Sequence, residues 1–322
     1  MSITNFPNGI SSMWVPVLWG GLPATSGKYI FVDYTLGSDG NNGEDTSAPV
    51  KTVAQANSLA RTNKDDVIVL MGNATHVLSS MLDLTKNRVH FVWMDATWGR
   101  LYGQNAKVSL TATTWATNIA TIKNTWVRNS FSNIKFMNES TVTEWIYCIA
   151  WGWEYALFTN CEFYKSTDLD ETTAAEYLCN DDSAQFINCT FGSLANIVAD
   201  NVIRPCVSLT ATISWKKARD VYFENCLFFR KAAWTESVMV YWTNATDVER
   251  LLLMKNCTFI SNALWAATPA HAVWFWAAQT QWTVLLQDCT SVDCTVMAQA
   301  SVGIYVSWAV PTFATTWVAK AS

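Results

Sequence analysis

The chain has 322 residues, enough for one large core, and its net charge of −5 excludes a general nucleic-acid binder, which needs a basic surface. No run of 18 consecutive apolar residues occurs, so the sequence predicts no membrane-spanning helix. Nine cysteines without a C-x-x-C pair, beside three histidines, do not predict a zinc site, and we expect no cofactor or metal.

Residues 1–27 are expected to form an irregular arm. Pro7, Pro16 and Pro23 keep this stretch out of a helix or a central strand. Its beginning, MSITNFPNGISS, lacks the basic and apolar regions of a secretory signal peptide. The arm is too apolar for a free linker, so we expect it to pack either on the rest of this chain or on a partner.

Residues 28–64 read as a strand, a loop and a helix. KYIFVDYT (28–35) has the composition of a strand, and PVKTVAQANSLARTN (49–63) has the spacing of an amphipathic helix. The loop between them carries Asp39, Glu44 and Asp45, whose spacing matches no EF-hand, so a solvated turn is favoured over a calcium site. DDVIVLMG (65–72) is the first plain buried strand, and further short strands are predicted up to residue 125.

A repeated unit occupies residues 131–291. Each copy places an apolar residue two positions before a corner residue and two more at one and three positions after it. The corners stand 27 to 37 residues apart. They are Asn133, Asn160, Asn188, Asn225, Asn256 and, in a last copy that departs from the pattern, Asp288. A repeat of this length is typical of a solenoid.

The repeat predicts two interior columns and one bend. In-register strands of successive coils lie ~4.8 Å apart, so equivalent residues should stack on each other. The predicted interior residues are Cys161, Cys189, Cys226, Cys257 and Cys289, and Phe136, Phe163, Phe191, Phe228 and Phe259. Asparagine tolerates the left-handed backbone of a sharp corner, and the stacked thiols should be reduced, buried and inert.

The order IFVD, GSDGNNG, KTVAQANSLA and DDVIVLMG resembles the start of pectate-lyase-type proteins, and NFPNGISSMWVPVL resembles the N-termini of phage virion proteins with that fold. The resemblance implies an all-β fold, a single-stranded right-handed parallel β-helix with three strands per coil. Its expected parts are an anchoring arm (1–27), a strand, loop and capping helix (28–64), and the β-helix with a β-rich tail (65–322). It also implies a homotrimer located in the virion, in contact with the major capsid protein or other virion proteins.

The tryptophan content is anomalous, because 18 tryptophans accompany only 13 glycines. Many stand where a turn glycine would be expected, which suggests glycine codons read under another genetic code, or deliberate replacements. If so, most of eight such tryptophans should lie at turns or strand ends with exposed rings. These eight are Trp14, Trp98, Trp126, Trp215, Trp242, Trp282, Trp308 and Trp317.

Candidate catalytic residues are carboxylates. Asp168, Asp170, Asp181 and Asp182, together with Glu171, could meet on one side of a solenoid, and polysaccharide hydrolases use two carboxylates at a defined separation. The Asn-Thr-Asp, Asp-Asp and Gly-His-Gly patterns of polygalacturonase-like enzymes are absent, so a solvated acidic surface is favoured.

Three functions remain open from the sequence. The favoured one is a structural virion protein, a capsid-decoration or head-associated subunit that docks through its arm. The alternative is a tailspike-type or tail-fibre-type protein that binds or degrades polysaccharide. A cell-surface adhesin is the third. Fold alone does not decide among them.

Overall fold

The computed structural model describes residues 10–12, 15–18, 25–72, 74–94, 107–111, 120–124, 127–139, 147–150, 154–165, 175–179, 182–197, 204–209, 217–232, 235, 237–242, 248–263, 268–275, 282–300, 303–307 and 319–320. Its one described α-helix, α1 (Val53–Leu59), has seven residues, and no helix in these ranges is long and apolar enough to cross a membrane.

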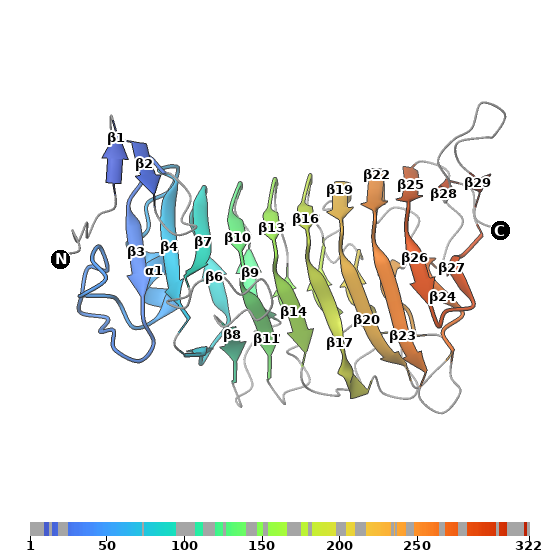
Figure 1. Cartoon of the computed structure of the whole chain (residues 1–322), viewed down its shortest axis with the longest axis horizontal. Helices are drawn as coiled ribbons and strands as arrows, with labels where there is room; N and C mark the ends of the chain where they lie inside the picture. The colour runs from blue at the N-terminus through green and yellow to red at the C-terminus, as the bar shows by residue number, and fades with distance from the viewer. Residues whose placement is uncertain are drawn as a thin grey trace, which may run out of the picture.

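The chain winds into a parallel β-helix in which each coil adds one strand to each of three sheets (Figure 1). Sheet 1 contains β3 (Tyr29–Val32), β4 (Asp66–Met71), β7 (Val89–Met94), β10 (Ser130–Ser132), β13 (Leu157–Thr159), β16 (Gln185–Ile187), β19 (Ala218–Glu224), β22 (Val248–Lys255), β25 (Trp282–Gln287), β28 (Ile304–Ser307) and β29 (Ala319–Lys320). The predicted class, a right-handed parallel β-helix with three strands per coil, is confirmed.

Sheets 2 and 3 have eight strands each. Sheet 2 contains β5 (His76–Leu78), β8 (Lys107–Leu110), β11 (Lys135–Asn138), β14 (Glu162–Lys165), β17 (Thr190–Ile197), β20 (Leu227–Ala232), β23 (Thr258–Ala263) and β26 (Thr290–Val292). Sheet 3 contains β6 (Leu82–Leu84), β9 (Ala120–Asn124), β12 (Tyr147–Ala150), β15 (Ala175–Leu178), β18 (Val207–Ser208), β21 (Val240–Trp242), β24 (His271–Phe275) and β27 (Val296–Ala298).

The corner between sheets 1 and 2 is formed by the repeated asparagines. Asn133, Asn160, Asn188, Asn225, Asn256 and Asp288 all have a left-handed backbone, with φ between 52° and 60°. Each corner N–H donates to a carbonyl of the next coil at 2.8–3.0 Å, as Asn160 does to Ile187. Two of the corner side chains also bond each other, since Asn160 Nδ2 donates to Asn133 Oδ1 at 3.1 Å.

Aromatic rings fill the interior on both sides of this corner. Phe136, Phe163, Phe191, Phe228 and Phe259 stack from coil to coil with ring centroids 4.7–5.5 Å apart. A parallel stack in sheet 1 joins Phe131, Phe158, Phe186 and Phe223 at 4.6–5.1 Å. All nine side chains are buried, so the two stacks form a continuous core.

The cysteine column lies between the two ring stacks. Cys161, Cys189, Cys226, Cys257 and Cys289 are buried and free of disulfides. Each thiol lies 3.4–3.7 Å from the carbonyl oxygen of a stacked side-chain position in the preceding coil, as Cys161 does from Phe131 and Cys189 from Phe158. The thiols therefore act as small core residues that also satisfy backbone acceptors.

The two ends of the solenoid are built differently. The N-terminal arm is not wholly irregular, contrary to the prediction, because β1 (Ile10–Ser12) and β2 (Val15–Leu18) pair antiparallel in a two-stranded sheet that tolerates Pro16. After the arm, β3 pairs in parallel with β4, and α1 packs against both strands. The helix is shorter than the predicted 49–63, because it begins at the N-cap Thr52 and Ala60 already has an extended backbone. At the C-terminal end β29 pairs antiparallel with β28, whereas β26 and β27 are the last described strands of sheets 2 and 3.

One tryptophan expectation is wrong. Trp242 ends β21, but its ring is fully buried and stacks on Phe275 at 5.0 Å, because it occupies an inward-facing position of sheet 3. Trp282 is the first residue of β25. The other six of these eight tryptophans lie outside the described residues, namely Trp14, Trp98, Trp126, Trp215, Trp308 and Trp317.

We predict that Phe191→Ala lowers the free energy of unfolding by about 3–5 kcal/mol, because it leaves a cavity in the ring stack. Denaturant titration measures this change. Thr190→Ala, on the outer side of the same strand, is the matched control and should cost less than about 0.5 kcal/mol. Similar costs for the two variants would contradict the inward position of Phe191.

Candidate functional site

A second column of left-handed residues lies at the start of the sheet 1 strands. Five or six residues before successive Asn corners, the chain adopts φ between 46° and 67° at Arg128, Tyr155, Ser183, Asp220 and Arg250. The sequence gives no glycine or asparagine at these positions to announce such a bend. The backbone is instead held by bonds to the next coil, as when Arg128 N–H donates to Glu154 and Tyr155 N–H to Asp182.

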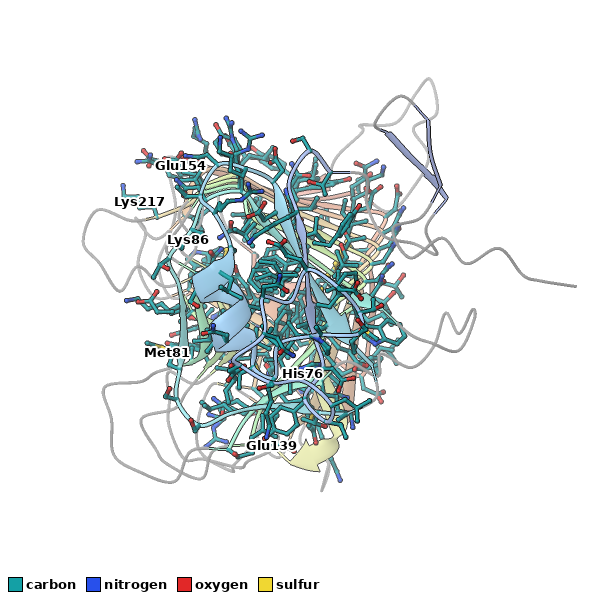
Figure 2. All side chains as sticks on the ribbon, turned by 90° about the vertical axis from the view of Figure 1, so that its left-hand side faces the viewer. His76, Met81, Lys86, Glu139, Glu154 and Lys217 are labelled. Atoms are coloured by element: carbon teal, nitrogen blue, oxygen red, sulfur yellow. The ribbon has the colours of Figure 1, made fainter. Side chains whose placement is uncertain are left out.

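The side chains at and beside this second corner are mostly charged, and we call this group, which includes Asp182, Arg219, Asp220, Glu249 and Arg250, the charged corner. Asp182 is ion-paired with Arg250 at 3.0 Å and with Arg219 at 3.7 Å. Arg219 also bonds Glu249 at 2.5 Å, and this hydrogen bond lowers the pKa of Glu249. In the end-on view of Figure 2, Lys86, Glu154 and Lys217 project from the same side of the solenoid. The charges thus pair along the solenoid axis.

Of the five carboxylates predicted as catalytic candidates, only Asp182 lies among the described residues. Asp182 lies in the charged corner, bound to two guanidinium groups rather than to a second carboxyl. Asp168, Asp170, Glu171 and Asp181 lie outside the described residues. The Oδ1 of Asp182 faces Arg250 and its Oδ2 faces Arg219, so Asp182 links coils through two ion pairs.

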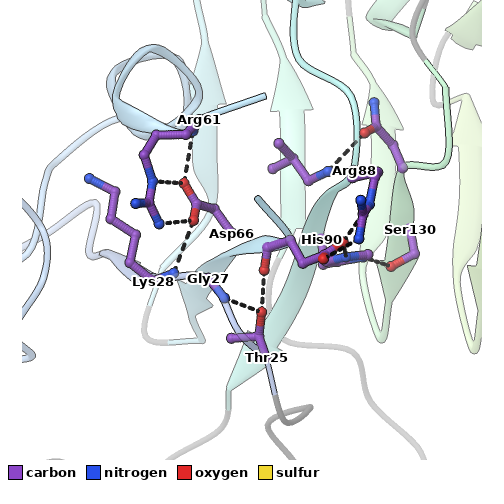
Figure 3. A network of polar contacts seen from close by, with 11 residues as sticks. Thr25, Gly27, Lys28, Arg61, Asp66, Arg88, His90 and Ser130 are labelled. Atoms are coloured by element: carbon purple, nitrogen blue, oxygen red, sulfur yellow. Dashed lines mark hydrogen bonds and ion pairs between the residues drawn. The ribbon is translucent and has the colours of Figure 1, made fainter. Parts of the chain in front are cut away.

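The root of the N-terminal arm is held by Asp66, a fully buried carboxylate at the start of β4 (Figure 3). Its oxygens accept from Lys28 N–H at 2.9 Å, from Arg61 N–H at 2.8 Å and from the Arg61 guanidinium at 2.6 and 3.0 Å. Burial alone would raise the pKa of Asp66, but these hydrogen bonds outweigh it and hold the pKa below its ordinary value.

Asp65, the neighbour of Asp66, belongs to a separate polar chain (Figure 3). Its carboxylate is ion-paired with Arg88 and lies 3.5 Å from His90 Nε2, while His90 Nδ1 lies 2.7 Å from Ser130 Oγ. Its backbone carbonyl accepts from the Thr25 hydroxyl. Sequence reasoning missed this cluster, because its members come from the turn before β4, from β7 and the residue before it, from β10 and from the arm, and they share no sequence motif. Like Asp66, it fixes the point where the arm joins the solenoid.

A buried ion pair lies inside the solenoid between sheets 2 and 3. Arg230 of β20 holds Glu176 of β15 with two bonds of 2.7 and 3.2 Å, and its guanidinium also contacts Cys206 Sγ at 3.2 Å. Burial raises the pKa of Cys206 to about 12, so the thiol stays protonated. A neutral thiol beside a satisfied ion pair has a structural rather than a nucleophilic role.

The loop considered for calcium is closed by internal bonds. Asp39 accepts from Lys51 N–H at 2.9 Å, from Thr52 N–H at 2.8 Å and from the Thr52 hydroxyl at 3.0 Å, and so braces the start of α1. Glu44 pairs with Lys28 at 3.1 Å. Across the residues that the structure describes, no group of three or more His, Cys, Asp or Glu side chains gathers as a metal site.

Comparison with known proteins identifies the fold. No family model matches the chain, and no curated protein matches its sequence. Pectate lyase Pel9A superposes with a TM-score of 0.58 at 11% identity, over 82% of this chain and 63% of the enzyme. Lower scores relate it to the pectin methylesterase of Aspergillus niger (0.48, 11% identity, 89% of this chain and 83% of the enzyme) and to ORF18 of Geobacillus virus E2 (0.45, 11%, 80% and 58%).

The likeness to Pel9A shows a parallel β-helix and nothing narrower. The chain spans less than two thirds of the length of that enzyme, and the identity is too low to carry over an activity.

We predict that Asp66→Asn costs about 1–3 kcal/mol near neutral pH, because a buried charge-assisted acceptor is lost. The pKa of Asp66 is lower in the folded chain, so its contribution is complete above the unfolded value of about 3.9 and is lost as the pH falls through the folded value. Below about pH 4 the variant should therefore lose stability less steeply than the wild type.

Unfolding free energies measured from pH 7 to 2.5 test this prediction. Asp83→Asn is the matched control, because Asp83 is half-exposed and pairs with Lys123 at 3.3 Å on the surface, where an ion pair contributes less than about 1 kcal/mol. An equal cost for the two variants, or parallel pH curves for Asp66→Asn and wild type, would contradict the assignment.

Proposed function

We propose that this protein is a structural component of a bacteriophage particle, a capsid-decoration or head-associated subunit that docks through its N-terminal arm on the major capsid protein or another virion protein. The phage assignment is supported by the resemblance of the arm NFPNGISSMWVPVL to virion-protein N-termini. The structural role is supported by the use that the solenoid makes of its charged groups.

The observation that carries the structural role is that carboxylates of the coils are paired with cations of other coils. Six such carboxylates are engaged, namely Glu162 with Lys135, Glu176 with Arg230, Asp182 with Arg219 and Arg250, Asp220 with Arg250, Glu224 with Lys255, and Glu249 with Arg219. None of these six is left free to act as one of the two carboxyl groups of a glycosidase. The pairs cross-link the coils of a rigid rod.

Polysaccharide binding is the second candidate, and a group of rings supports it. On the outer side of sheet 3, Trp274 packs against Tyr241 at 5.7 Å and against His271 at 6.4 Å, and its ring is partly exposed. Partly exposed aromatic faces of this kind are what a sugar ring stacks on. In this second candidate function, Trp274 binds the polysaccharide whether or not the protein also degrades it.

We predict that deletion of residues 1–27 leaves a folded solenoid but abolishes incorporation into phage particles. Assembly in cells that supply the other virion proteins, followed by gel analysis of purified particles, measures incorporation. Leu36→Ala is the matched control, because Leu36 is an exposed apolar residue (78%) of the N-terminal end outside the arm, and this variant should be incorporated normally. Normal incorporation of the truncated chain would refute docking through the arm.

We also predict that the purified protein does not degrade the surface polysaccharide of its host. Reducing-end release and glycan-array binding, each with Trp274→Ala as a comparison, separate the two candidates. Turnover that is lost in Asp181→Asn would refute the structural role, and glycan binding that is lost in Trp274→Ala would favour the second candidate.

Analytical ultracentrifugation should show a trimer, and monomer alone at high concentration would count against the proposed trimer.

A further inference from the structure

The outer face of sheet 1 becomes apolar toward the C-terminal end of the solenoid. In each of β19, β22, β25 and β28, one residue lies between two core residues and therefore faces outward. These residues pair in register as one row, which we call the sheet 1 stripe, namely Tyr222, Leu253, Leu285 and Tyr305. In earlier coils the same row holds Ser130, Leu157 and Gln185, so its continuous aromatic and aliphatic part starts at β19.

Sheet 2 carries a matching stripe on the other side of the Asn corner. The outward residues of β20, β23 and β26 that pair in register form what we call the sheet 2 stripe, namely Phe229, Ile260 and Val292. Leu227, in the adjacent outward row, extends this stripe. Before β20 the same face carries charges, since Lys135 pairs with Glu162 at 3.0 Å and its Nζ lies 5.1 Å from the Tyr164 ring centroid.

Both stripes are open to solvent in the single chain. Among the described residues six large apolar side chains are exposed, and four of them lie in or beside the stripes, namely Leu227 (38%), Leu251 (36%), Val292 (44%) and Tyr305 (38%). Leu251 stands two residues before Leu253 and so lies on the same face of β22. The other stripe residues are partly exposed. A contiguous exposed apolar surface is typical of a contact surface between proteins.

The two stripes lie at the same height along the solenoid. Each coil passes through sheet 1, the Asn corner and sheet 2 in turn, so β19 and β20 belong to one coil, β22 and β23 to the next, and β25 and β26 to the one after (Figure 1). A surface that pairs with itself about a two-fold axis needs only one stripe. Two stripes at one height on adjacent faces instead fit a ring, in which one face of each copy contacts the other face of the next.

We propose that a second copy of this chain covers each stripe, with the sheet 1 stripe of one copy packed on the sheet 2 stripe of the next around an axis parallel to the solenoid. Copies related by such a rotation stay at the same height, so apolar coils meet apolar coils. The exposed corner residues Asn225, Asn256 and Asp288 then lie between the two contacts, nearest the axis. The contact surface stands on the observations above, and its closure as a trimer rests on the proposed function.

Two charge substitutions, one for each stripe, test this arrangement. Leu251→Glu places a carboxylate beside the sheet 1 stripe and Leu227→Glu places one beside the sheet 2 stripe, and both positions are exposed rather than part of the core. Every contact uses one stripe of each kind, so either substitution alone should raise the dissociation constant of the oligomer about tenfold or more. Sedimentation equilibrium measures this constant, and circular dichroism confirms that each variant is folded.

Leu36→Glu is the matched control, because Leu36 is exposed but lies at the N-terminal end, and this variant should associate like the wild type. A 1:1 mixture of the two stripe variants gives a sharper readout. The intact sheet 1 stripe of the Leu227→Glu chain still fits the intact sheet 2 stripe of the Leu251→Glu chain. The mixture should therefore form heterodimers, and no closed ring, at a concentration where each variant alone is monomeric.

Four results would overturn the proposal. They are a wild-type chain that stays monomeric, association that neither substitution weakens, a mixture without heterodimers, and a single variant that still dimerises, because the last result means that one stripe pairs with itself. A monomeric chain that enters particles would remove this inference and leave docking through the arm intact. If the chains associate as predicted but the chain without residues 1–27 still enters particles, the proposed function fails while this inference stands.

Discussion

The structure depends on in-register stacking of equivalent backbone groups from one coil to the next. Each Asn corner donates its N–H to the coil that follows, and the strands on either side pair in parallel with the same neighbour. Because the register is fixed at every corner, a residue type that suits one coil suits the same position in the next. The rings, thiols and amides form columns for that reason.

Each column stabilises the fold through a different kind of interaction. Stacked phenylalanines are among the largest fully buried side chains, and the cysteine thiols fill the space behind the corner while they bond the preceding coil. The charged corner joins the coils with ion pairs at the surface, where each pair adds little by itself. Glu176 and Arg230 differ, because their charges are buried and each depends on the other for compensation.

The repeat made most of the fold predictable, because column residues such as Asn160, Cys161 and Phe163 reflect local geometry directly. The charged corner was not predictable, because Arg128 and Tyr155 have no intrinsic preference for a left-handed backbone and are held there by bonds to the next coil. Trp242 illustrates the same limit, since its burial is decided by register with Leu209 and Phe275 rather than by its neighbours in sequence.

The candidate sites were predicted less well. Pairing with Arg219 and Arg250 decides the role of Asp182, and these arginines are far from it in sequence. The cluster of Asp65, His90 and Ser130 likewise joins the turn before β4 to β7 and β10, and the spacing of these elements in the chain is irregular. Such groups appear only after the coils are in register.

The two left-handed corners also define a natural module for gene duplication. A segment that runs from one asparagine corner to the next carries a complete coil, with its own ring, thiol and amide for each column. Copying it in frame would lengthen the rod by ~4.8 Å and leave every other contact in place. A copied segment that is not a whole coil would break the register of every column at its joints. The drift of the corner spacing from 27 to 37 residues then records where loops have grown between coils without disturbing the columns.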